Sequence, residues 1–380
     1  MTRDTRIDML RGVSILLVVI QHVAMRLDPN EGVLASLLPA RVIDGIFTHG
    51  YEAVFVFFVI SGFLIASNAL TSWGRLDRIE LRTFYARRFA RIVPPLLVLV
   101  VVLSILHLCS VNRYVIDQPG QSLPGAIASA LGFYLNWYEA STGHFLPAGW
   151  DVLWSLSIEE VFYLAFPLVC LLLRRQWLLV PVLAALALSL PWTRSIAQAG
   201  GQIWQQKAYL PGMSAIALGI LAALLSARIP TMSRATARVL VALGWLGIGI
   251  NMFAEDAVWH VLHDAAMLLW ALSAALLLLG FRWSAKDGSR ALRGTGWIGS
   301  FGRLSYEVYL THMFAVFAAV TMFRASGAGA HWAILWMPPT VAAAWLLGKL
   351  VERCISTPCN RGLRRLLIKR SALSPVPQGC

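Results

Sequence analysis

The chain has 380 residues, of which 58% are apolar and 13% charged, and its 32 Lys and Arg against 19 Asp and Glu give a formal net charge of +13. Soluble domains are about 45–50% apolar and about 25% charged, so this chain has too little polar surface to cover a water-facing globule of its size. A soluble fold is therefore excluded.

Apolar stretches long enough to cross a bilayer follow one another along the whole chain. A hydrocarbon core about 30 Å thick needs about 20 mostly apolar residues for each helical crossing. The alternating segments of a membrane β-barrel are absent, so the sequence predicts an all-α, polytopic membrane protein with about ten transmembrane helices. The predicted spans are 6–25, 50–71, 92–110, 152–173, 177–193, 209–227, 238–253, 258–281, 304–323 and 332–351.

The first predicted span is not expected to be a cleaved signal peptide, because Arg11 and His22 interrupt its apolar core and no small-residue cleavage site follows. The longest connection joins the third and fourth spans, and its segment 122–138 is expected to form one helix at the membrane interface. We expect residues 1–352 to form a transmembrane domain and residues 353–380 a basic cytoplasmic tail.

The basic residues are distributed unequally between the two sides of the membrane. With the N-terminus in the cytoplasm, the inside segments hold 26 of the 32 Lys and Arg, and the outside segments hold 6. This bias is the positive-inside rule, so both termini are predicted to be cytoplasmic and nucleic-acid binding is not needed to explain the charge. The five Cys have neither metal-ligand spacing nor a disulfide framework, so no metal site is expected.

Ionisable side chains inside the spans are candidates for function, because each costs about 2.5–3.5 kcal/mol at the bilayer centre on insertion scales. Arg11 and His22 share a face of the first span and lie about 16 Å apart along its axis. The topology places Glu159, in the fourth span, at the depth of His22 near the outer side. The sequence leaves open the roles of three further groups, namely His312, Glu160 and Asp264.

With these residues the chain resembles acyltransferase family 3, the integral-membrane enzymes that O-acylate bacterial cell-surface glycans and some small molecules. The family's first-helix signature, an Arg and a His separated by ten residues, is matched by Arg11 and His22. Phe55 stands where many members carry an acidic residue, so the role of that carboxylate is lost or is taken by Glu52. Four more motifs match in order, at residues 57–64, 84–95, 154–163 and 304–312.

The resemblance implies that the domain of residues 1–352 is a membrane O-acyltransferase. It would move an acyl group, with acetyl-CoA as the expected donor, from the cytoplasm to a hydroxyl at the outer face of a bacterial inner (cytoplasmic) membrane. The implied acceptor is a cell-surface polysaccharide, a lipopolysaccharide or a lipid-linked glycan. Guanidinium groups suit the phosphates of coenzyme A. The expected donor-binding residues are Arg87, Arg88, Arg91, Ser305 and Tyr306.

The expected catalytic residues are His22, Glu159 and Arg11. His22 would act as general base on the acceptor hydroxyl, with Glu159 orienting the imidazole and stabilising its charged form. A covalent acyl-His or acyl-Ser61 intermediate stays an alternative. No hydrolase-like domain follows the membrane core, so a second catalytic step outside would need another protein.

A different class of function stays open beside the enzyme. Intramembrane Arg, His and Glu also suit a proton-coupled transporter or a flippase-like component of glycan assembly. The paired, interrupted segments of inverted-repeat transporters are not visible in the two halves of the chain, which favours the enzyme. The sequence indicates neither the acceptor nor the oligomeric state.

Overall fold

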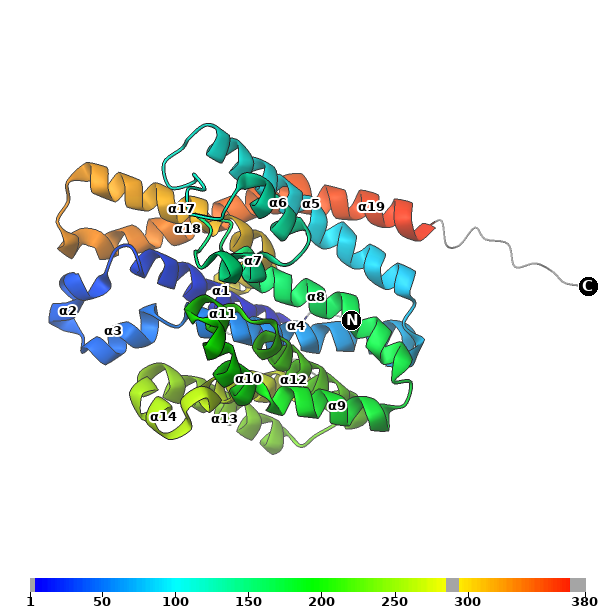
Figure 1. Cartoon of the computed structure of the whole chain (residues 1–380). Coiled ribbons are helices and arrows are strands. Elements are labelled where there is room, and N and C mark those ends of the chain that lie inside the picture. Colours follow the sequence, from blue (N-terminus) through cyan, green and yellow to red (C-terminus); the bar gives the residue numbers. More distant parts are fainter. Residues whose placement is uncertain (1–3, 285–293, 370–380) are drawn as a thin grey trace, which may run out of the picture.

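The computed structural model describes residues 4–284 and 294–369, and this part of the chain is built from helices and their connections without a β-strand (Figure 1). The all-α prediction is confirmed. The last residues of the predicted basic tail, 370–380, lie outside the described residues. The longer helices are α1 (Thr5–Ala24), α4 (Gly50–Trp73), α5 (Leu81–Leu108), α8 (Leu153–Leu172), α9 (Gln176–Leu188), α12 (Tyr209–Arg228), α13 (Arg234–Phe253), α15 (Ala266–Ser284), α17 (Ser305–Ser326) and α18 (Met337–Val351).

Shorter helices connect these elements and cover their ends. They are α2 (Val33–Leu37), α3 (Ala40–Phe47), α6 (Leu123–Leu131), α7 (Leu135–Thr142), α10 (Leu190–Ala197), α11 (Gln202–Lys207), α14 (Glu255–Leu262), α16 (Gly296–Arg303) and α19 (Thr357–Lys369). Single turns of 3-10 helix lie at Pro29–Glu31, Leu76–Arg78, Gln198–Gly200 and His263–Ala265, a longer one spans Ala330–Trp336, and a π-helical turn, Glu352–Ser356, joins α18 to α19.

Nine helical segments of the described chain are long and apolar enough to cross a membrane, or ten if α9 and α10 count as one span bent by 48°. Pro191, near the start of α10, explains this bend, because proline lacks the N–H that would continue the ladder of α9. The prediction of about ten spans is confirmed. The orientation of the two termini stays a prediction from the charge pattern.

Helix α5 is longer than its apolar segment. It begins at Leu81 rather than at residue 92, and it continues through Pro94 and Pro95. Hydropathy marks only the part of a helix that is apolar enough for lipid, so the preceding turns, which are rich in arginine, were not predicted as helix. Arg87 and Arg91 therefore lie on ordered turns of α5 rather than in a connecting segment.

The connection between α5 and α8 forms two short helices, so the prediction of one interfacial helix over 122–138 was wrong. Ser122 caps α6 by accepting a hydrogen bond from the N–H of Gly125. The helix is interrupted after Gly132. Phe133 takes a left-handed backbone conformation (φ 58°), which a continuous right-handed helix does not allow. Helix α7 then starts in a new direction and packs on α8 and α11.

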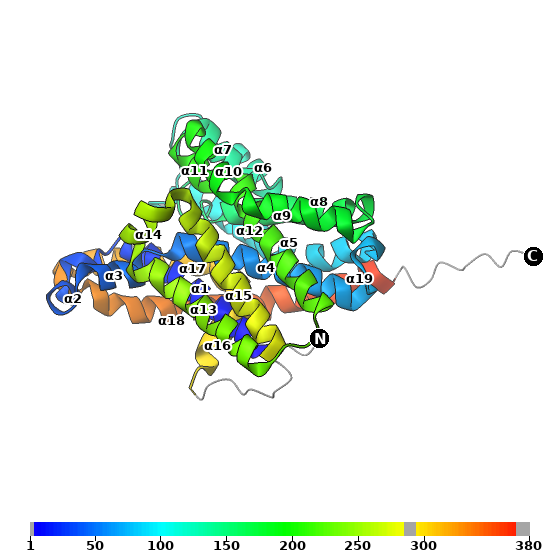
Figure 2. The same cartoon turned by 90° about the horizontal axis from the view of Figure 1, so that it is seen from below.

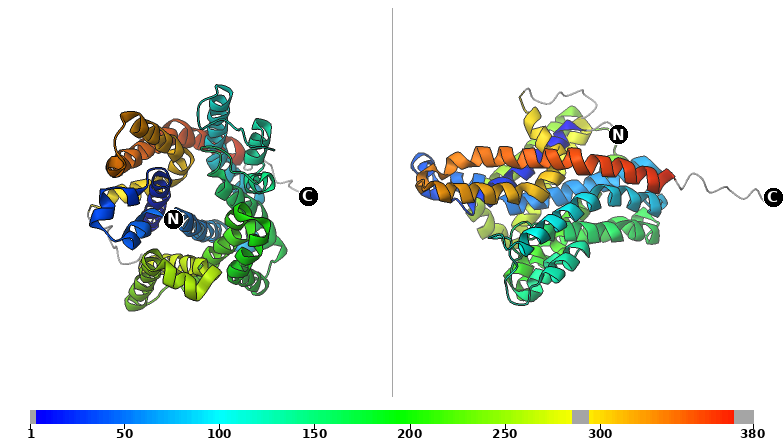
Figure 3. Two further views of the ribbon diagram at one scale, coloured as in Figure 1. Left: turned by 60° about the vertical axis from the view of Figure 1, so that its left-hand side comes forward. Right: turned by 90° about the horizontal axis from the view of Figure 1, so that it is seen from above.

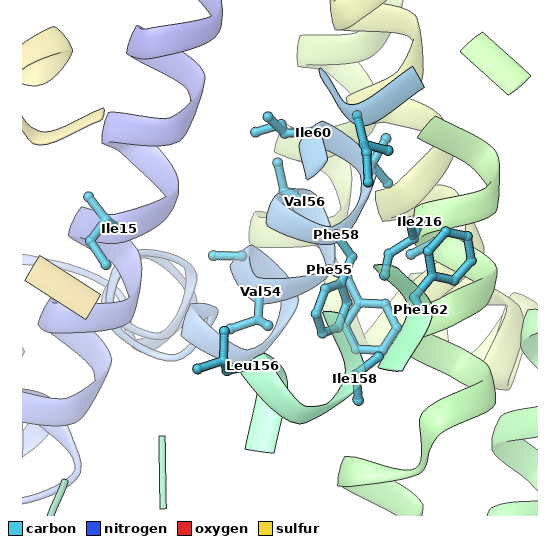
Figure 4. Close-up of a cluster of buried hydrophobic side chains, with 14 of the residues drawn as sticks. Ile15, Val54, Phe55, Val56, Phe58, Ile60, Leu156, Ile158, Phe162 and Ile216 are labelled. Carbon is cyan, nitrogen blue, oxygen red and sulfur yellow. The ribbon is translucent and has the colours of Figure 1, made fainter. Parts of the chain in front are cut away.

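Close helix contacts hold the bundle together. A side chain at Gly62 of α4 would collide with the carbonyl of Ile216 in α12, and one at Gly219 of α12 would collide with the carbonyl of Val59 in α4. Small residues that let backbones approach in this way are typical of membrane helix pairs. Figure 4 shows the buried core around α4, where Phe55 and Phe58 lie beside Ile158 of α8.

The long helices run beside one another in a single bundle. Helices α13 and α15 lie side by side (Figure 2). The left view of Figure 3 shows the other long helices arranged around α1 and α4, and α4 is the most buried of the candidate spans. The right view shows α18 leading into α19, which packs along α5.

Candidate active site

Two cavities lie between the helices. The first, which we name the arginine cavity, has a volume of about 480 Å³ and is lined by side chains of α1, α4, α5, α8, α17 and α19. The second, the histidine cavity, has a volume of about 840 Å³ and is lined from α1, α4, α11, α14, α15, α17 and the connection before α8. Val54 of α4 and Tyr309 of α17 line both cavities, which therefore meet at these two side chains.

The arginine cavity brings together all the residues that the sequence predicts to bind the donor. Arg87, Arg88 and Arg91 line it from α5, and Ser305 and Tyr306 line it from the start of α17. Residues three and four positions apart share a helix face, which is why the three arginines of α5 reach the same cavity. Their role in binding a donor stays a prediction.

Two of these guanidinium groups keep a donor nitrogen without a partner. Arg88 lies 3.3 Å from a carboxylate oxygen of Glu160, and its guanidinium carbon is 3.1 Å from the ring centre of Tyr163. Arg87 donates to the hydroxyl of Ser72 at 3.1 Å. The Nε atoms of both arginines are buried, and no described residue accepts a hydrogen bond from them. Buried unpaired donors are costly, so this site fits a ligand with anionic oxygens.

The C-terminal helix α19 contributes to the same cavity, which the sequence analysis missed. Asn360 and Arg364 lie one turn apart on α19 and line the cavity together. The side-chain oxygen of Asn360 is buried, and no described residue donates to it. The available signal was the spacing of the basic residues in the predicted tail, which places several of them on one face of a helix.

The first-helix arginine also lies in the arginine cavity. Arg11 donates to the hydroxyl of Ser305 at 2.6 Å and so connects α1 to α17. Ser61 of α4 hydrogen bonds both Tyr163 and Glu159 of α8. Arg11, Glu159 and Ser61 therefore line one cavity together.

Glu159 does not accompany His22, so the expected pairing of these two side chains was wrong. Glu159 lines the arginine cavity, whereas His22 lines the histidine cavity. The reason lies in the segment before α8, where the side chains of Trp150 and Leu153 are almost completely buried. Helix α8 thus begins inside the protein rather than at the outer surface. Glu159, about 9 Å further along the helix, lies deeper than a start at the surface would place it.

The neighbour of His22 is a second histidine. The ring centres of His22 and His312 are 4.9 Å apart in an edge-to-face arrangement. The Nδ1 of His22 lies 2.8 Å from the carbonyl oxygen of Val18, and a carbonyl only accepts hydrogen bonds. Nδ1 therefore carries the proton in the neutral ring, and Nε2 is the nitrogen able to accept one.

A buried ionic cluster lies near His22. The ammonium group of Lys207 contacts Glu139 of α7 at 2.6 Å, and it also pairs with Asp151. Glu139 accepts a further hydrogen bond from the N–H of Leu146, 2.8 Å away. Burial raises the pKa of Glu139 to about 8, the negative charge of Asp151 adds to the rise, and Lys207 opposes it. One ammonium group cannot fully neutralise two carboxylates, so Lys207 does not cancel the rise in the pKa of Glu139.

No sequence motif marks this cluster, so it was not predicted. Glu139 and Asp151 fall in a long connection, and Lys207 falls between two predicted spans. One signal was available. Lys207 is the only lysine among the predicted outer segments of a chain in which nearly all basic residues are arginine. Asp151 and Lys207 line the histidine cavity with His22.

The rest of the histidine cavity carries paired charges. Arg194 lies 3.5 Å from Asp264, which gives Asp264 a partner outside its own helix. The ring of His49 lies 3.5 Å from a carboxylate oxygen of Glu52. Burial lowers the pKa of His49, but the nearby carboxylate of Glu52 outweighs this effect, and the pKa is raised.

Aromatic side chains complete the wall of this cavity. The rings of Tyr51 and Trp154 stack with their centres 5.9 Å apart. Trp259 and Trp270 line the cavity from α14 and α15. Flat aromatic faces next to charged and amide groups are able to hold a polar ring.

The comparison with protein families agrees with this architecture. The profile of the family described as an acyltransferase domain matches residues 4–349. Peptidoglycan O-acetyltransferase OatA of Listeria monocytogenes serovar 1/2a is 25% identical over 342 residues, which cover 82% of this chain and 51% of that protein. O-acetyltransferase OatA of Staphylococcus aureus strain NCTC 8325 is 33% identical over 143 residues, which cover 36% of this chain and 22% of that protein.

The chain thus matches about half the length of the Listeria relative and a smaller share of the Staphylococcus relative. No solved structure matches the chain at a significant level.

Proposed function

Since the chain belongs to the acyltransferase domain family, we propose that it is a multi-pass O-acetyltransferase of the bacterial cytoplasmic membrane. Acetyl-CoA is the proposed donor, and a hydroxyl of a cell-surface or lipid-linked glycan at the outer face is the proposed acceptor. The Listeria relative is named for peptidoglycan, which makes peptidoglycan the first acceptor to test.

One observation carries the proposal. A cavity rich in arginine and a cavity that contains a histidine meet at two shared side chains, Val54 and Tyr309. A phosphorylated donor and a hydroxyl-bearing glycan acceptor require binding sites of different character. The two cavities differ in this way, since one is rich in arginine and the other contains His22, and they meet at Val54 and Tyr309.

The arginine cavity is the proposed donor site. The phosphates of coenzyme A would be held by Arg87, Arg88, Arg91 and Arg364, because guanidinium groups form paired, charge-assisted hydrogen bonds with phosphate oxygens. The buried Nε atoms of Arg87 and Arg88, which have no partner among the described residues, support this use. Ser305 and Tyr306 would line the path of the pantetheine arm.

His22 is the proposed general base. Its Nε2 would take the proton of the acceptor hydroxyl as the hydroxyl oxygen attacks the thioester carbonyl carbon. The new C–O ester bond forms, the C–S bond breaks, and the proton on His22 passes to the departing thiolate. The products are an acetyl ester and free coenzyme A, and the imidazole returns to its neutral form.

Different carboxylates would serve the two cavities. Asp151 shares the histidine cavity with His22 and would favour the imidazolium formed during the reaction. Glu159 would act on the donor side, where it and Ser61 face Arg11. Arg11 and Glu159 thus keep their proposed place in catalysis, with Glu159 acting through the arginine cavity.

The stacked rings of Tyr51 and Trp154 would hold the sugar rings of the acceptor, because aromatic faces pack well against the apolar face of a sugar.

The test uses purified protein in lipid vesicles with radiolabelled acetyl-CoA and peptidoglycan fragments. An O-acetyltransferase releases free coenzyme A and forms alkali-labile acetyl esters on the glycan. A proton-coupled transporter or flippase would leave the thioester intact, and that result would refute the proposal.

A further inference from the structure

Few side chains lie at the boundary between the two cavities. Val54 and Tyr309 line both cavities, and no other described residue does. Val54 is buried in α4, among the core side chains drawn in Figure 4, and Tyr309 is half-buried on α17. An aliphatic side chain and a phenol ring therefore lie at the junction between the cavity of the arginines and the cavity of His22.

Hydrogen bonds hold the ring of Tyr309 in place. Its hydroxyl donates to the carbonyl oxygen of Val152 at 2.9 Å and lies 2.7 Å from the hydroxyl of Ser155. Both partners lie at the start of α8, so the ring bridges α17 and α8. These hydrogen bonds restrain the hydroxyl end of the ring. The dense packing of a protein interior further limits how far the ring can move to make room for a larger group.

Any acyl group that travels from the arginine cavity to the hydroxyl activated by His22 has to cross this boundary. We infer that Val54 and Tyr309 form an acyl-length filter that admits the acetyl group and excludes longer acyl chains. The inference rests on the proposed function, and it assigns the choice of acyl group to two side chains outside the catalytic set.

The filter acts through volume. Each extra methylene of the acyl chain has to be accommodated beside the side chain of Val54 and the anchored ring of Tyr309. One methylene too many in an apolar pocket typically lowers kcat/KM by about 10–200-fold. Removing two methyl groups at Val54 provides the missing volume, and adding a methylene there takes volume away.

The test measures kcat/KM with acetyl-, propionyl-, butyryl- and hexanoyl-CoA in lipid vesicles. For the wild-type protein we expect a loss of at least tenfold at each step beyond acetyl. Val54→Ala should move this loss to a longer chain, and Val54→Leu should lower propionyl transfer further relative to acetyl transfer. Tyr309→Phe, which removes the anchor at Val152 and Ser155, should also favour longer chains.

The matched control is Val56→Ala. Val56 is buried on the same helix and lines neither cavity, so its truncation makes the same chemical change without widening the boundary (Figure 4). The ratio of butyryl to acetyl transfer should stay at the wild-type value in this variant.

The outcomes separate the filter from the proposed function. Acetyl transfer with an identical chain-length profile in Val54→Ala, Val54→Leu and Val56→Ala would overturn the filter alone. Equal wild-type rates for acetyl- and butyryl-CoA would do the same. If the wild-type protein releases no coenzyme A from acetyl-CoA, the proposed function fails, and the filter fails with it.

Discussion

The imidazole rings of His22 and His312 meet edge to face, with their centres 4.9 Å apart and their planes at 74°. Each ring is anchored to helix backbone through Nδ1, to the carbonyl oxygen of Val18 in one case and of Tyr309 in the other, both at 2.8 Å. Two rings fixed in this way present their Nε2 atoms as acceptors. His312, whose role the sequence left open, is thus the side chain that packs on the proposed base.

Replacing His22 by Ala should lower acetyl transfer by about 10²–10⁴-fold, because general base catalysis contributes a factor of this size. The measurements are coenzyme A release and glycan-bound acetyl esters, normalised to the amount of inserted protein. His260→Ala changes an exposed histidine that lines neither cavity and should keep the wild-type rate. Wild-type glycan acetylation in the His22→Ala variant would remove His22 from the mechanism.

Arg11→Gln and Glu159→Gln should each lower kcat, and their effects should not add. Residues that act as one unit lose most of their joint contribution when either is removed, and these two line the same cavity. Asp151→Asn, which changes the other cavity, should combine with Glu159→Gln more nearly additively. A cycle of single and double variants measured by kcat checks this, and additive losses for Arg11 and Glu159 would argue against a joint role.

Arg364→Ala should raise the KM for acetyl-CoA by about tenfold or more, because a hydrogen bond to a charged group contributes about 1.5–3 kcal/mol. The neighbouring Arg365 does not line the arginine cavity, so Arg365→Ala is the matched control on the same helix. The readout is the dependence of coenzyme A release on donor concentration. Equal KM values for both variants would exclude α19 from the donor site.

The stability of the contact between α7 and α11 should fall as the pH rises from about 4.5 to about 8, because the pKa of Glu139 is raised from 4.5 to about 8 in the folded protein. Within this window the folded state keeps a proton that the unfolded state releases, so rising pH favours unfolding. The charged groups that face Glu139 are Lys207 and Asp151.

Glu139→Gln keeps a neutral side chain at every pH and should flatten this dependence. Asp117→Asn changes an exposed carboxylate in the same long connection and should retain the wild-type slope. Thermal unfolding in detergent, followed at several pH values, provides the comparison. A wild-type slope in the Glu139→Gln variant would mean that another group carries the pH dependence.

Gly62→Ala should destabilise the protein, since its added carbon would collide with the backbone carbonyl of Ile216. Overpacking a well-filled site costs about 1–3 kcal/mol, and a backbone obstacle yields less than a side chain does. Gly249→Ala, in α13, is the control, because nothing lies within 4 Å of the added carbon. The thermal midpoint in detergent should fall for the first variant and hold or rise for the second.

The crossing segments could be predicted because their information is local. About 20 consecutive apolar residues specify a span whatever surrounds them. The start of α5 was missed for the same reason, since Arg87 and Arg91 are helical without being apolar. Helix rise and topology place Arg11 and Ser305 near the same end of the bundle, which agrees with the hydrogen bond between them.

The histidine cavity depends on contacts that hydropathy does not encode. The depth of Glu159 was misjudged because Trp150 and Leu153 draw the segment before α8 into the protein. The contact between Glu139 and Lys207 joins two connections 68 positions apart in sequence, and no periodic pattern links them. Such pairs are decided by tertiary packing alone.

The position of Val54 and Tyr309 has a further consequence in a membrane that maintains a proton gradient. Two polar cavities set end to end would form a leak for protons and water if nothing separated them. In that arrangement the aliphatic side chain of Val54 and the anchored phenol ring of Tyr309 would limit the passage of protons and water between the cavities. Widening this partition should lower the membrane potential of the cell, whether or not an acyl donor is being consumed.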